Sequence, residues 1–184
     1  PDPRKSEPFG VVLVHRDRHL IVVEKPTGLL TAPLPRTASK AAEDGSAAPS
    51  ALRAAGLLCR KNGGPPKVVY RLEKFTSGLL LFARSSDVAT ALQGQIQAGA
   101  MKRTFRCVVV GAPELSTGLI SSMLIDSGNG RKGSREGTLT VKAAKSRPPG
   151  KTPGPGNLAI TRYRTVVEGA GQTALEVRVV TAQP

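Results

Sequence analysis

Short apolar runs separated by polar turns dominate the start of the sequence. Two runs rich in Val and Leu, Val11–Val14 and Leu20–Val23, flank the polar turn 16–18. Runs of this length and composition on either side of a tight turn predict a β-hairpin over residues 9–25. Pro26 has no backbone N–H to donate, so we expect the hairpin to end there.

The pattern then predicts a strand, a loop and a second strand over residues 67–84. Within them, Leu79–Ala83 is a continuous apolar run, which is typical of a strand buried on both faces. Apolar residues at helical spacing predict helices over residues 50–58 and 86–97. Further strands are predicted over residues 104–110, 158–167 and 173–181. Strands outnumber helices, so we predict an α+β fold with a mixed, mostly antiparallel sheet and a few flanking helices.

Two stretches break this pattern, residues 33–66 and 128–156. Both are rich in Pro, Gly and small residues, a composition that buries too little apolar surface to offset the entropy of ordering. We therefore predict one domain over residues 9–184 with flexible inserts at these two stretches, and poor order over 36–48 and 128–156. The second insert is also basic, which fits either phosphate contacts or a solvated linker.

The balance of charge narrows the class of partner. Lys and Arg number 27 against 13 Asp and Glu, which gives a formal charge of +14 and a pI of about 10.6. Such a field attracts polyanions, so nucleic acid is the expected partner, with a solubilising charge as the plain alternative. The sequence contains no basic amphipathic helix and no apolar run of membrane-spanning length, so no membrane partner is expected.

Cysteine and histidine usage argues against a disulfide framework and a metal centre. The two cysteines, Cys59 and Cys107, form no Cys-x-x-Cys pair. We expect an intracellular, cytoplasmic protein, with organelles and the nucleus left open. Cys107 alternates with Phe105 along a predicted strand, which favours a core thiol over a nucleophile. His15 and His19 bracket the predicted hairpin turn with no third ligand nearby, so no metal is expected.

One stretch carries candidate chemistry. Residues 69–84 place an arginine, a carboxylate and Thr-Ser-Gly in a polar loop between two apolar runs. Arg71 and Glu73 are two residues apart, so an extended backbone projects both from the same side. From this spacing alone, a surface ion pair is favoured over a catalytic pair.

The sequence around this loop resembles a known family motif. Residues 70–80, YRLEKFTSGLL, are similar to the His-Arg-Leu-Asp-x-x-Thr-Ser-Gly-Leu-Leu motif of RluA/RsuA-like RNA pseudouridine synthases. Residues 17–30, DRHLIVVEKPTGLL, resemble the family's Asp-Asp-x-Leu-Leu-Val-Val-Asn-Lys-Pro-Ala-Gly-Leu-Leu hairpin. Residues 101–111, MKRTFRCVVVG, resemble Val-x-Lys-x-Tyr-x-Ala-x-Val-x-Gly. Shorter matches, to Gly-x-Ile and Thr-x-Tyr-x-Val, follow at residues 118–120 and 161–164.

The resemblance implies a fold, a reaction and a set of site residues. It implies a pseudouridine synthase catalytic domain that isomerises uridine in rRNA or tRNA, without a cofactor or a metal. The family breaks the N-glycosidic bond of uridine and rejoins the base through carbon, with an aspartate as nucleophile. An adjacent arginine enters the space that the flipped base leaves. By position, Glu73 corresponds to the nucleophile and Arg71 to the arginine. The resemblance also implies a set of RNA contacts, which are Arg71, Tyr70, Lys74, Lys102 and Arg103. We expect a monomer.

Departures from the family pattern bear on activity. Glu73 replaces the aspartate, and its longer side chain extends the carboxylate by about 1–1.5 Å. Phe105 replaces an active-site tyrosine and lacks its hydroxyl. Tyr70 replaces a histidine. The family's Thr-Gly-Arg-x-His-Gln-Ile-Arg segment, which supplies a basic residue to the carboxylate, is not reached before the sequence ends at Pro184, so it is either lacking or lies beyond this end. We predict that Arg71, Glu73 and Phe105 converge on one cleft, with slow turnover or none. An inactive RNA-binding relative and a basic interaction domain stay open as other hypotheses.

Overall fold

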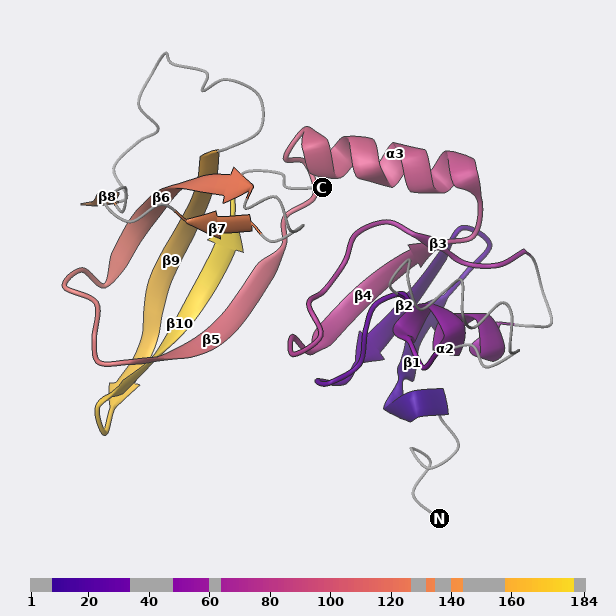
Figure 1. Cartoon of the computed structure of the whole chain (residues 1–184), viewed down its shortest axis with the longest axis horizontal. Helices are drawn as coiled ribbons and strands as arrows, with labels where there is room; N and C mark the ends of the chain where they lie inside the picture. Colours follow the sequence, from indigo (N-terminus) through magenta and orange to yellow (C-terminus); the bar gives the residue numbers. More distant parts are fainter. Residues whose placement is uncertain are drawn as a thin grey trace. The chain divides into compact units, whose positions relative to one another are not determined.

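The structure is a computed structural model, and it describes residues 8–33, 48–59, 64–126, 132–134, 140–143 and 158–180. The described chain holds two antiparallel sheets, two α-helices and one short 3-10 helix (Figure 1). The predicted α+β class is confirmed. The chain divides into two compact units, Pro1–Gly94 and Gln95–Pro184, and the single domain over residues 9–184 stays a prediction.

The first unit is built on a four-stranded sheet in the order β1-β2-β4-β3. Its strands are β1 (Val12–Arg16), β2 (Leu20–Lys25), β3 (Lys67–Val68) and β4 (Gly78–Ala83). Its helices are η2 (Pro8–Gly10), α2 (Ala51–Leu58) and α3 (Ser86–Gln97), the last of which runs into the second unit. β1 and β2 form the predicted hairpin, α2 lies beside β2 and η2, and both predicted helices are confirmed.

The core of the first unit lies on one face of this sheet. Ile21 pairs with Phe82 and Val23 pairs with Leu80 across β2 and β4, and all four side chains are buried. Cross-strand partners share a face of a sheet, so these residues form one apolar layer. Leu79 points to the opposite face and is 60% exposed. The prediction that β4 is buried on both faces is therefore wrong at this residue, because successive side chains of a strand alternate between faces.

Both α-helices begin at a serine. The Oγ of Ser50 accepts the N–H of Arg53 at 3.2 Å, and the Oγ of Ser85 accepts the N–H of Val88 at 3.3 Å. Each serine thus satisfies one of the N–H groups that have no partner inside the first turn of a helix. After α3, Gly99 adopts a φ of +69°, in the left-handed region that favours glycine at helix ends.

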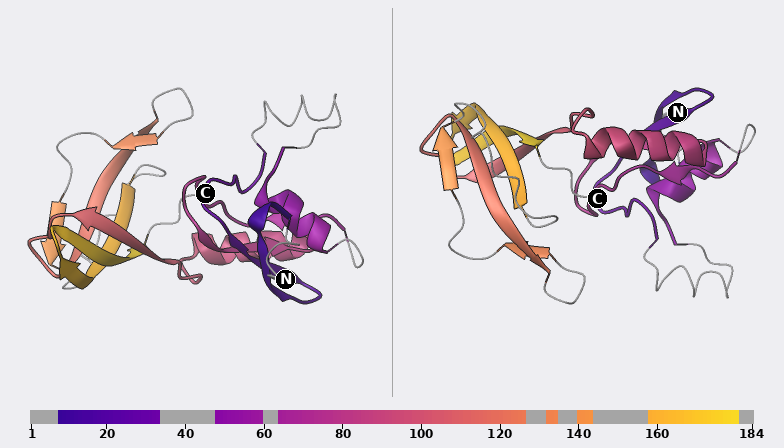
Figure 2. Two further views of the ribbon diagram at one scale, coloured as in Figure 1. Left: turned by 90° about the horizontal axis from the view of Figure 1, so that it is seen from below. Right: turned by 90° about the horizontal axis from the view of Figure 1, so that it is seen from above.

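The second unit is a six-stranded sheet in the order β5-β10-β9-β6-β7, with β8 also paired to β6 (Figure 2). Its strands are β5 (Thr104–Val110), β6 (Thr117–Asp126), β7 (Lys132–Ser134), β8 (Thr140–Ala143), β9 (Leu158–Gly169) and β10 (Gln172–Val179). The strands predicted over residues 104–110, 158–167 and 173–181 are confirmed as β5, β9 and β10. All pairings described in both units are antiparallel.

Three strands of the second sheet differ from the sequence expectation. β6 contains a glycine and a Ser-Ser pair among its apolar residues, so its pattern does not predict a strand. β7 and β8 lie within residues 128–156, where we predict a poorly ordered insert, and both are formed by pairing with β6. The remainder of that insert, and residues 36–47 of the first one, lie outside the described residues.

Gly118 of β6 makes room for the ring of Tyr163 on β9. The two residues are cross-strand partners, and a Cβ atom added to Gly118 would lie 2.6 Å from a ring carbon of Tyr163. The absence of a side chain therefore lets this ring lie buried against the sheet. Cys107 on β5 is exposed, so the predicted core thiol is wrong. β5 is an edge strand with β10 as its neighbour, which leaves its side chains covered from one side.

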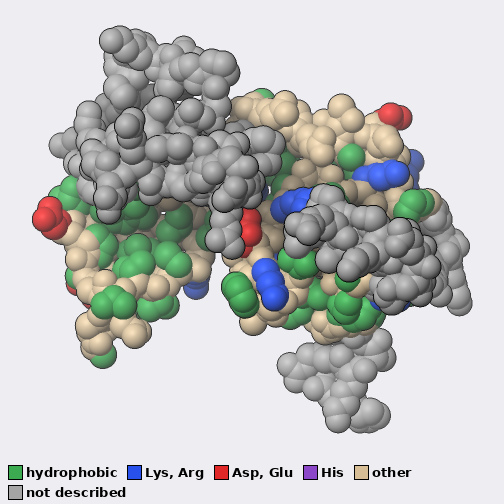
Figure 3. Space-filling model, in the orientation of Figure 1, with side chains coloured by type: hydrophobic (Ala, Val, Ile, Leu, Met, Phe, Trp, Pro, Cys, Tyr) green, Lys and Arg blue, Asp and Glu red, His purple; other side chains and the backbone are tan. Residues whose placement is uncertain are grey.

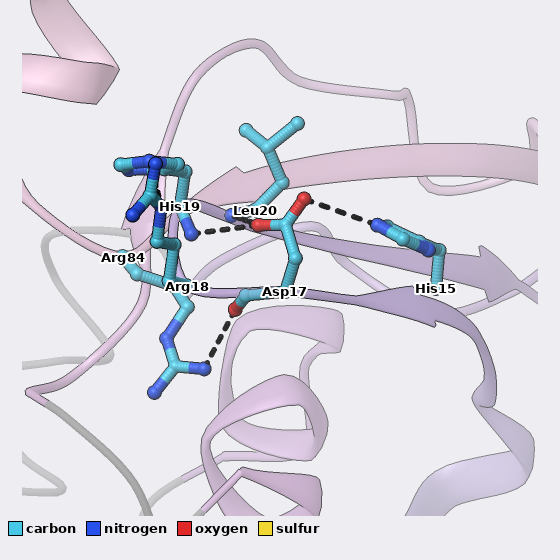
Figure 4. A network of polar contacts seen from close by, with 6 residues as sticks. All are labelled: His15, Asp17, Arg18, His19, Leu20 and Arg84. Carbon is cyan, nitrogen blue, oxygen red and sulfur yellow. Dashed lines mark hydrogen bonds and ion pairs between the residues drawn. The ribbon is translucent and has the colours of Figure 1, made fainter.

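Asp17 organises the turn of the β1–β2 hairpin (Figure 4). Its Oδ1 accepts the N–H groups of His19 at 2.6 Å and Leu20 at 2.7 Å, and its Oδ2 lies 3.1 Å from Nε2 of His15. Arg84 donates to the carbonyl of Asp17 at 2.8 Å, which ties the turn to the end of β4. The hydrogen bonds from the N–H groups of His19 and Leu20, followed by that from His15, lower the pKa of Asp17 to about 2.

The lowered pKa of Asp17 predicts that the hairpin loses stability in acid. The pKa is about 2 in the folded chain against an ordinary 3.8, so the ionised carboxylate stabilises the fold above about pH 4 and stops doing so as the pH falls through 2. Asp17→Asn should therefore lose less stability between pH 4 and pH 2 than the wild-type chain. Urea unfolding midpoints at both pH values test this, with Glu24→Gln as an exposed control. Equal losses in the Asn variant and the wild type would contradict it.

Candidate active site

The candidate loop, residues 71–78, leads from β3 into β4 and is tied to the segment that follows β2. The buried Thr31 donates through Oγ1 to the carbonyl of Leu72 at 2.8 Å, and the same oxygen accepts the N–H of Leu72 at 3.0 Å. Leu72 lies between Arg71 and Glu73 and is itself buried. These two hydrogen bonds therefore fix the backbone that carries both candidate side chains.

Lys25, the last residue of β2, is a second anchor of the loop. Its side chain is 0% exposed, and its Nζ donates to the carbonyls of Leu29 at 2.7 Å, Pro26 at 3.0 Å and Lys74 at 3.3 Å. An ammonium group has three protons, so each has an acceptor, as a buried cation requires. Burial lowers the pKa of Lys25 below its ordinary value of 10.5. The side chain thus joins the turn after β2 to the candidate loop.

The middle of the loop is held through its carbonyl groups. The N–H of Gly28 donates to the carbonyl of Lys74 at 2.8 Å, and the Oγ1 of Thr27 donates to the carbonyl of Phe75 at 3.1 Å. Gly28 has a φ of +81°, a conformation that glycine adopts without strain. The tight turn after β2 can therefore present its donors to two successive residues of the loop.

Arg71 and Glu73 present their side chains to solvent. Both are exposed, and no ion pair of the described residues joins them to each other or to a third group. The surface ion pair that their spacing alone favours is therefore wrong. The N–H of Thr76 donates to the carbonyl of Glu73 at 3.0 Å and closes a turn. Glu73 thus combines a fixed backbone with an accessible carboxylate, which is what a nucleophile needs.

Tyr70 and Lys74 flank this pair in the sequence. The hydroxyl of Tyr70 donates to the carbonyl of Leu79 at 3.0 Å, which holds the half-buried ring against the start of β4. Lys74 is exposed, and its Nζ lies 5.3 Å from the centre of the Phe75 ring. The predicted site residues of the first unit therefore lie on the anchored loop or, for Tyr70, directly before it.

Phe105 belongs to the second unit, on β5. It is half-buried and pairs with Val177 of β10, which in turn pairs with Tyr163 of β9. Partners in register share a face of the sheet, so these three side chains lie on one face and the arginines of β9 and β10 lie on the other. The convergence of Phe105 with Arg71 and Glu73 stays a prediction, because these residues belong to different units.

A basic hollow of about 260 Å³ is present in the second unit. Lys102 and Arg103, both predicted RNA contacts, line it together with Arg162 and Arg178. Arg162 and Arg178 are direct cross-strand partners, an arrangement in which like charges repel. An anion bound between them offsets this repulsion, so the hollow suits a phosphate group.

Glu176 neutralises part of the charge beside the hollow. Nε and Nη2 of Arg164 donate to its two carboxylate oxygens, both at 3.0 Å, in a bidentate pair. The hydrogen bond from Arg164 lowers the pKa of Glu176, and the same pair raises the pKa of Arg164. Arg178 lies 3.8 Å from the same carboxylate. Arg162 has no carboxylate partner in the described part of the chain, so its charge is available to a ligand.

Sequence reasoning identifies Arg71 and Glu73 but misses the residues that hold them. The position of Lys25 in β2 could have identified it, because it is two residues from Val23 and therefore lies on the same, buried face of the strand. Thr31 has no such signal, since it follows the strand in a segment without periodicity. A polar residue in such a segment is recognised as an anchor only once its partner is known.

The described residues offer neither a metal site nor a membrane-spanning helix. Within the described ranges, no three His, Cys, Asp or Glu residues lie close enough together to hold a metal ion. None of the helices formed by these residues has the length and apolar character needed to cross a bilayer. A site that works without metal or cofactor stays a prediction of the sequence.

Comparison with known proteins identifies the family. A family model described as RNA pseudouridylate synthase matches residues 19–183. The chain is 26% identical to ribosomal large subunit pseudouridine synthase D of Pseudomonas aeruginosa over 97% of the chain and 48% of that protein. It is 27% identical to the Zymomonas mobilis protein of the same name over 100% of the chain and 53% of that protein. It is 29% identical to tRNA pseudouridine synthase C of Pectobacterium carotovorum over 89% of the chain and 37% of that protein.

Solved structures share the fold. Human RNA pseudouridylate synthase domain containing 4 matches with a TM-score of 0.62 at 18% identity, over 94% of this chain and 60% of that one. Human RNA pseudouridylate synthase domain containing 1 matches with a TM-score of 0.55 at 16% identity. The chain spans about half the length of the two bacterial synthase D relatives. The family model covers most of the chain, including the anchored loop, and the chain therefore belongs to the RNA pseudouridylate synthase family.

Proposed function

We propose that the chain isomerises uridine to pseudouridine in RNA, with Glu73 as the nucleophile and Arg71 in the space that the flipped base leaves. The observation that carries the proposal is the anchored loop. Side chains and backbone donors of the turn after β2 fix its backbone, while the side chains of Arg71 and Glu73 are exposed. Catalysis by a positioned carboxylate depends on this combination.

The proposed reaction is an isomerisation, so its atoms balance within the nucleoside. The carboxylate of Glu73 attacks the nucleoside and the bond between the base nitrogen and the sugar carbon breaks. The base turns, a bond forms between carbon 5 of the base and the same sugar carbon, and the carboxylate is released. One proton leaves carbon 5 and one proton joins the freed nitrogen. By the resemblance, Phe105 stands where the family has a tyrosine, and its ring could pack on the base but carries no hydroxyl for the proton transfer.

The reaction can be followed by tritium release from RNA labelled at carbon 5 of uridine. Turnover by the wild-type chain supports the proposal. RNA binding without turnover would instead establish the inactive RNA-binding relative. Two relatives are named for the large ribosomal subunit and one for tRNA, so both classes of RNA are the substrates we propose and would test first.

The basic hollow of the second unit predicts the salt dependence of RNA binding. Lys102→Gln combined with Arg162→Gln removes two of its cations. Each phosphate contact contributes about 0.7 to 0.9 to the slope of log affinity against log salt, so the double variant should flatten the slope by roughly 1.4 to 1.8. Titrations at several salt concentrations measure this slope.

A matched control removes the same charge from the other unit. Arg18 and Lys67 are exposed and lie outside the hollow. Arg18→Gln combined with Lys67→Gln should therefore change the slope less than the hollow variant. An equal flattening by both variants would show that total charge, rather than the hollow, governs binding.

A further inference from the structure

Phe75 is exposed beside the proposed nucleophile. Its side chain is 78% exposed, against 37% for Phe9 and 0% for Phe82. The chain has few aromatic residues, with four Phe, two Tyr and no Trp. A single exposed apolar side chain is common at protein surfaces, so the surroundings of this ring decide whether it can meet a ligand.

The backbone under this ring is held in place. The carbonyl of Phe75 accepts the hydroxyl of Thr27 at 3.1 Å, and the carbonyl of the preceding Lys74 accepts the N–H of Gly28 at 2.8 Å and the Nζ of Lys25 at 3.3 Å. The ring is therefore carried outward by a fixed segment and does not fold back onto the core. A fixed backbone lowers the entropy lost when the ring binds a ligand, because only the side-chain torsions remain to be ordered.

Lys74 adds a positive charge next to the ring. Its Nζ lies 5.3 Å from the ring centre, within the range of a cation–π interaction. The exposure of the ring leaves room for a planar group to stack, and the ammonium group lies where it can meet a phosphate. Aromatic rings combined with basic side chains are the means by which proteins hold unpaired nucleotides.

We infer that Phe75, with Lys74 beside it, is a stacking subsite for an unpaired base of the RNA next to the target uridine. This inference rests on the proposed function. Phe75 lies two residues from Glu73, a span of at most about 7 Å of chain. Removal of the target base from its stack leaves neighbouring bases without a partner, and the ring supplies one.

The absence of tryptophan allows a direct test in the full chain. Phe75→Trp places a single indole at the subsite, and Phe9→Trp is its matched control, since Phe9 is a second exposed phenylalanine with a cation, Arg53, 5.4 Å from its ring centre. A short single-stranded RNA of mixed sequence should quench the emission of Phe75→Trp and leave that of Phe9→Trp unchanged. A fully paired duplex of the same sequence should quench neither, because its bases are already stacked.

Affinity measurements separate stacking from simple apolar contact. Phe75→Ala and Phe75→Leu should weaken binding of the single strand about tenfold, while Phe75→Trp binds as the wild type does, since stacking requires a π-face. Wild-type affinity in Phe75→Leu, or equal quenching of both Trp variants, would overturn the inference.

The same experiments distinguish failure of the subsite from failure of the proposed function. If the wild-type chain converts uridine and the variants of Phe75 bind normally, the subsite is wrong and the function stands. If the wild-type chain neither binds RNA nor converts uridine, the proposed function fails and the subsite fails with it.

Discussion

The substitution Glu73→Gln is expected to lower pseudouridine formation by a factor of about a thousand or more. The amide keeps the size of the carboxylate but is not a nucleophile, so the covalent step is lost while RNA binding is retained. Hydrogen bonds through Leu72 and Thr76 hold the backbone on both sides of residue 73, and the side chain itself is exposed. The exchange therefore leaves the loop in place.

Tritium release and RNA affinity are measured on the same protein preparations. Glu24→Gln is the matched control, because Glu24 is an exposed carboxylate of the same unit on β2. It should leave both quantities unchanged. Wild-type turnover in Glu73→Gln would assign the nucleophile to another group.

The same assay tests the geometry of this position. Glu73→Asp withdraws the carboxylate by about 1.5 Å toward the position of the family's aspartate. A misplacement of about 1 Å can cost roughly a hundredfold in rate, but we expect Glu73→Asp alone to raise turnover only a little, because the other departures from the family remain. Residues that act as a unit are not additive, so full recovery should also require the hydroxyl restored by Phe105→Tyr. A slower Glu73→Asp variant would show that this loop is adapted to the longer side chain.

The elements that the sequence predicts are those with an apolar run or a helical spacing of their own. β2 and β4 each contain a short apolar run, and the two serine-capped helices carry their own start signals. β6 could not be found in this way, because its Gly118 is explained only by the ring of Tyr163 on a strand far along the chain. Cys107 shows the same limit, since its exposure depends on whether other elements cover this part of β5.

The exposure of apolar side chains in the second unit also depends on tertiary structure and not on the local sequence. Figure 3 shows hydrophobic side chains at the surface over the strands of the second unit. Among the exposed residues there are Val108, Val110, Val166 and Val167. From the sequence alone, these residues would be expected in buried strands. β-branched residues favour strands, but they do not indicate which face of the sheet is covered. Covering depends on neighbouring elements, which no local pattern contains.

The candidate site also contains residues that the sequence identifies and residues that it does not. The motif around Arg71 and Glu73 identifies the groups that carry the proposed chemistry, since reactive side chains are chosen for their type. The anchors Lys25 and Thr31 act through backbone carbonyls and N–H groups of a loop more than forty residues away in sequence. Backbone groups are the same at every residue, so no sequence pattern marks which loop these anchors hold.

The second large effect is expected at Lys25. Lys25→Met keeps an unbranched side chain of similar length in the buried position but removes all three donors. The carbonyls of Pro26 and Leu29 then lose the ammonium, while the carbonyl of Lys74 still accepts from Gly28. Each of these two part-buried acceptors costs about 1–3 kcal/mol when it loses its partner, so we expect the free energy of unfolding to fall by about 3 kcal/mol.

In Lys25→Met, the candidate loop should also become more mobile as the protein loses stability. The N–H of Gly28 reports on it directly, because its acceptor is the carbonyl of Lys74, and its hydrogen exchange should be faster in Lys25→Met. Lys67→Met is the control, since Lys67 is an exposed lysine of the same unit, and it should change neither exchange nor stability. Turnover in Lys25→Met should fall by more than the unfolded fraction explains, because the backbone that carries Glu73 is no longer fixed. A variant as stable as the wild type, with unchanged exchange at Gly28, would show that Lys25 fills space and does not hold the loop.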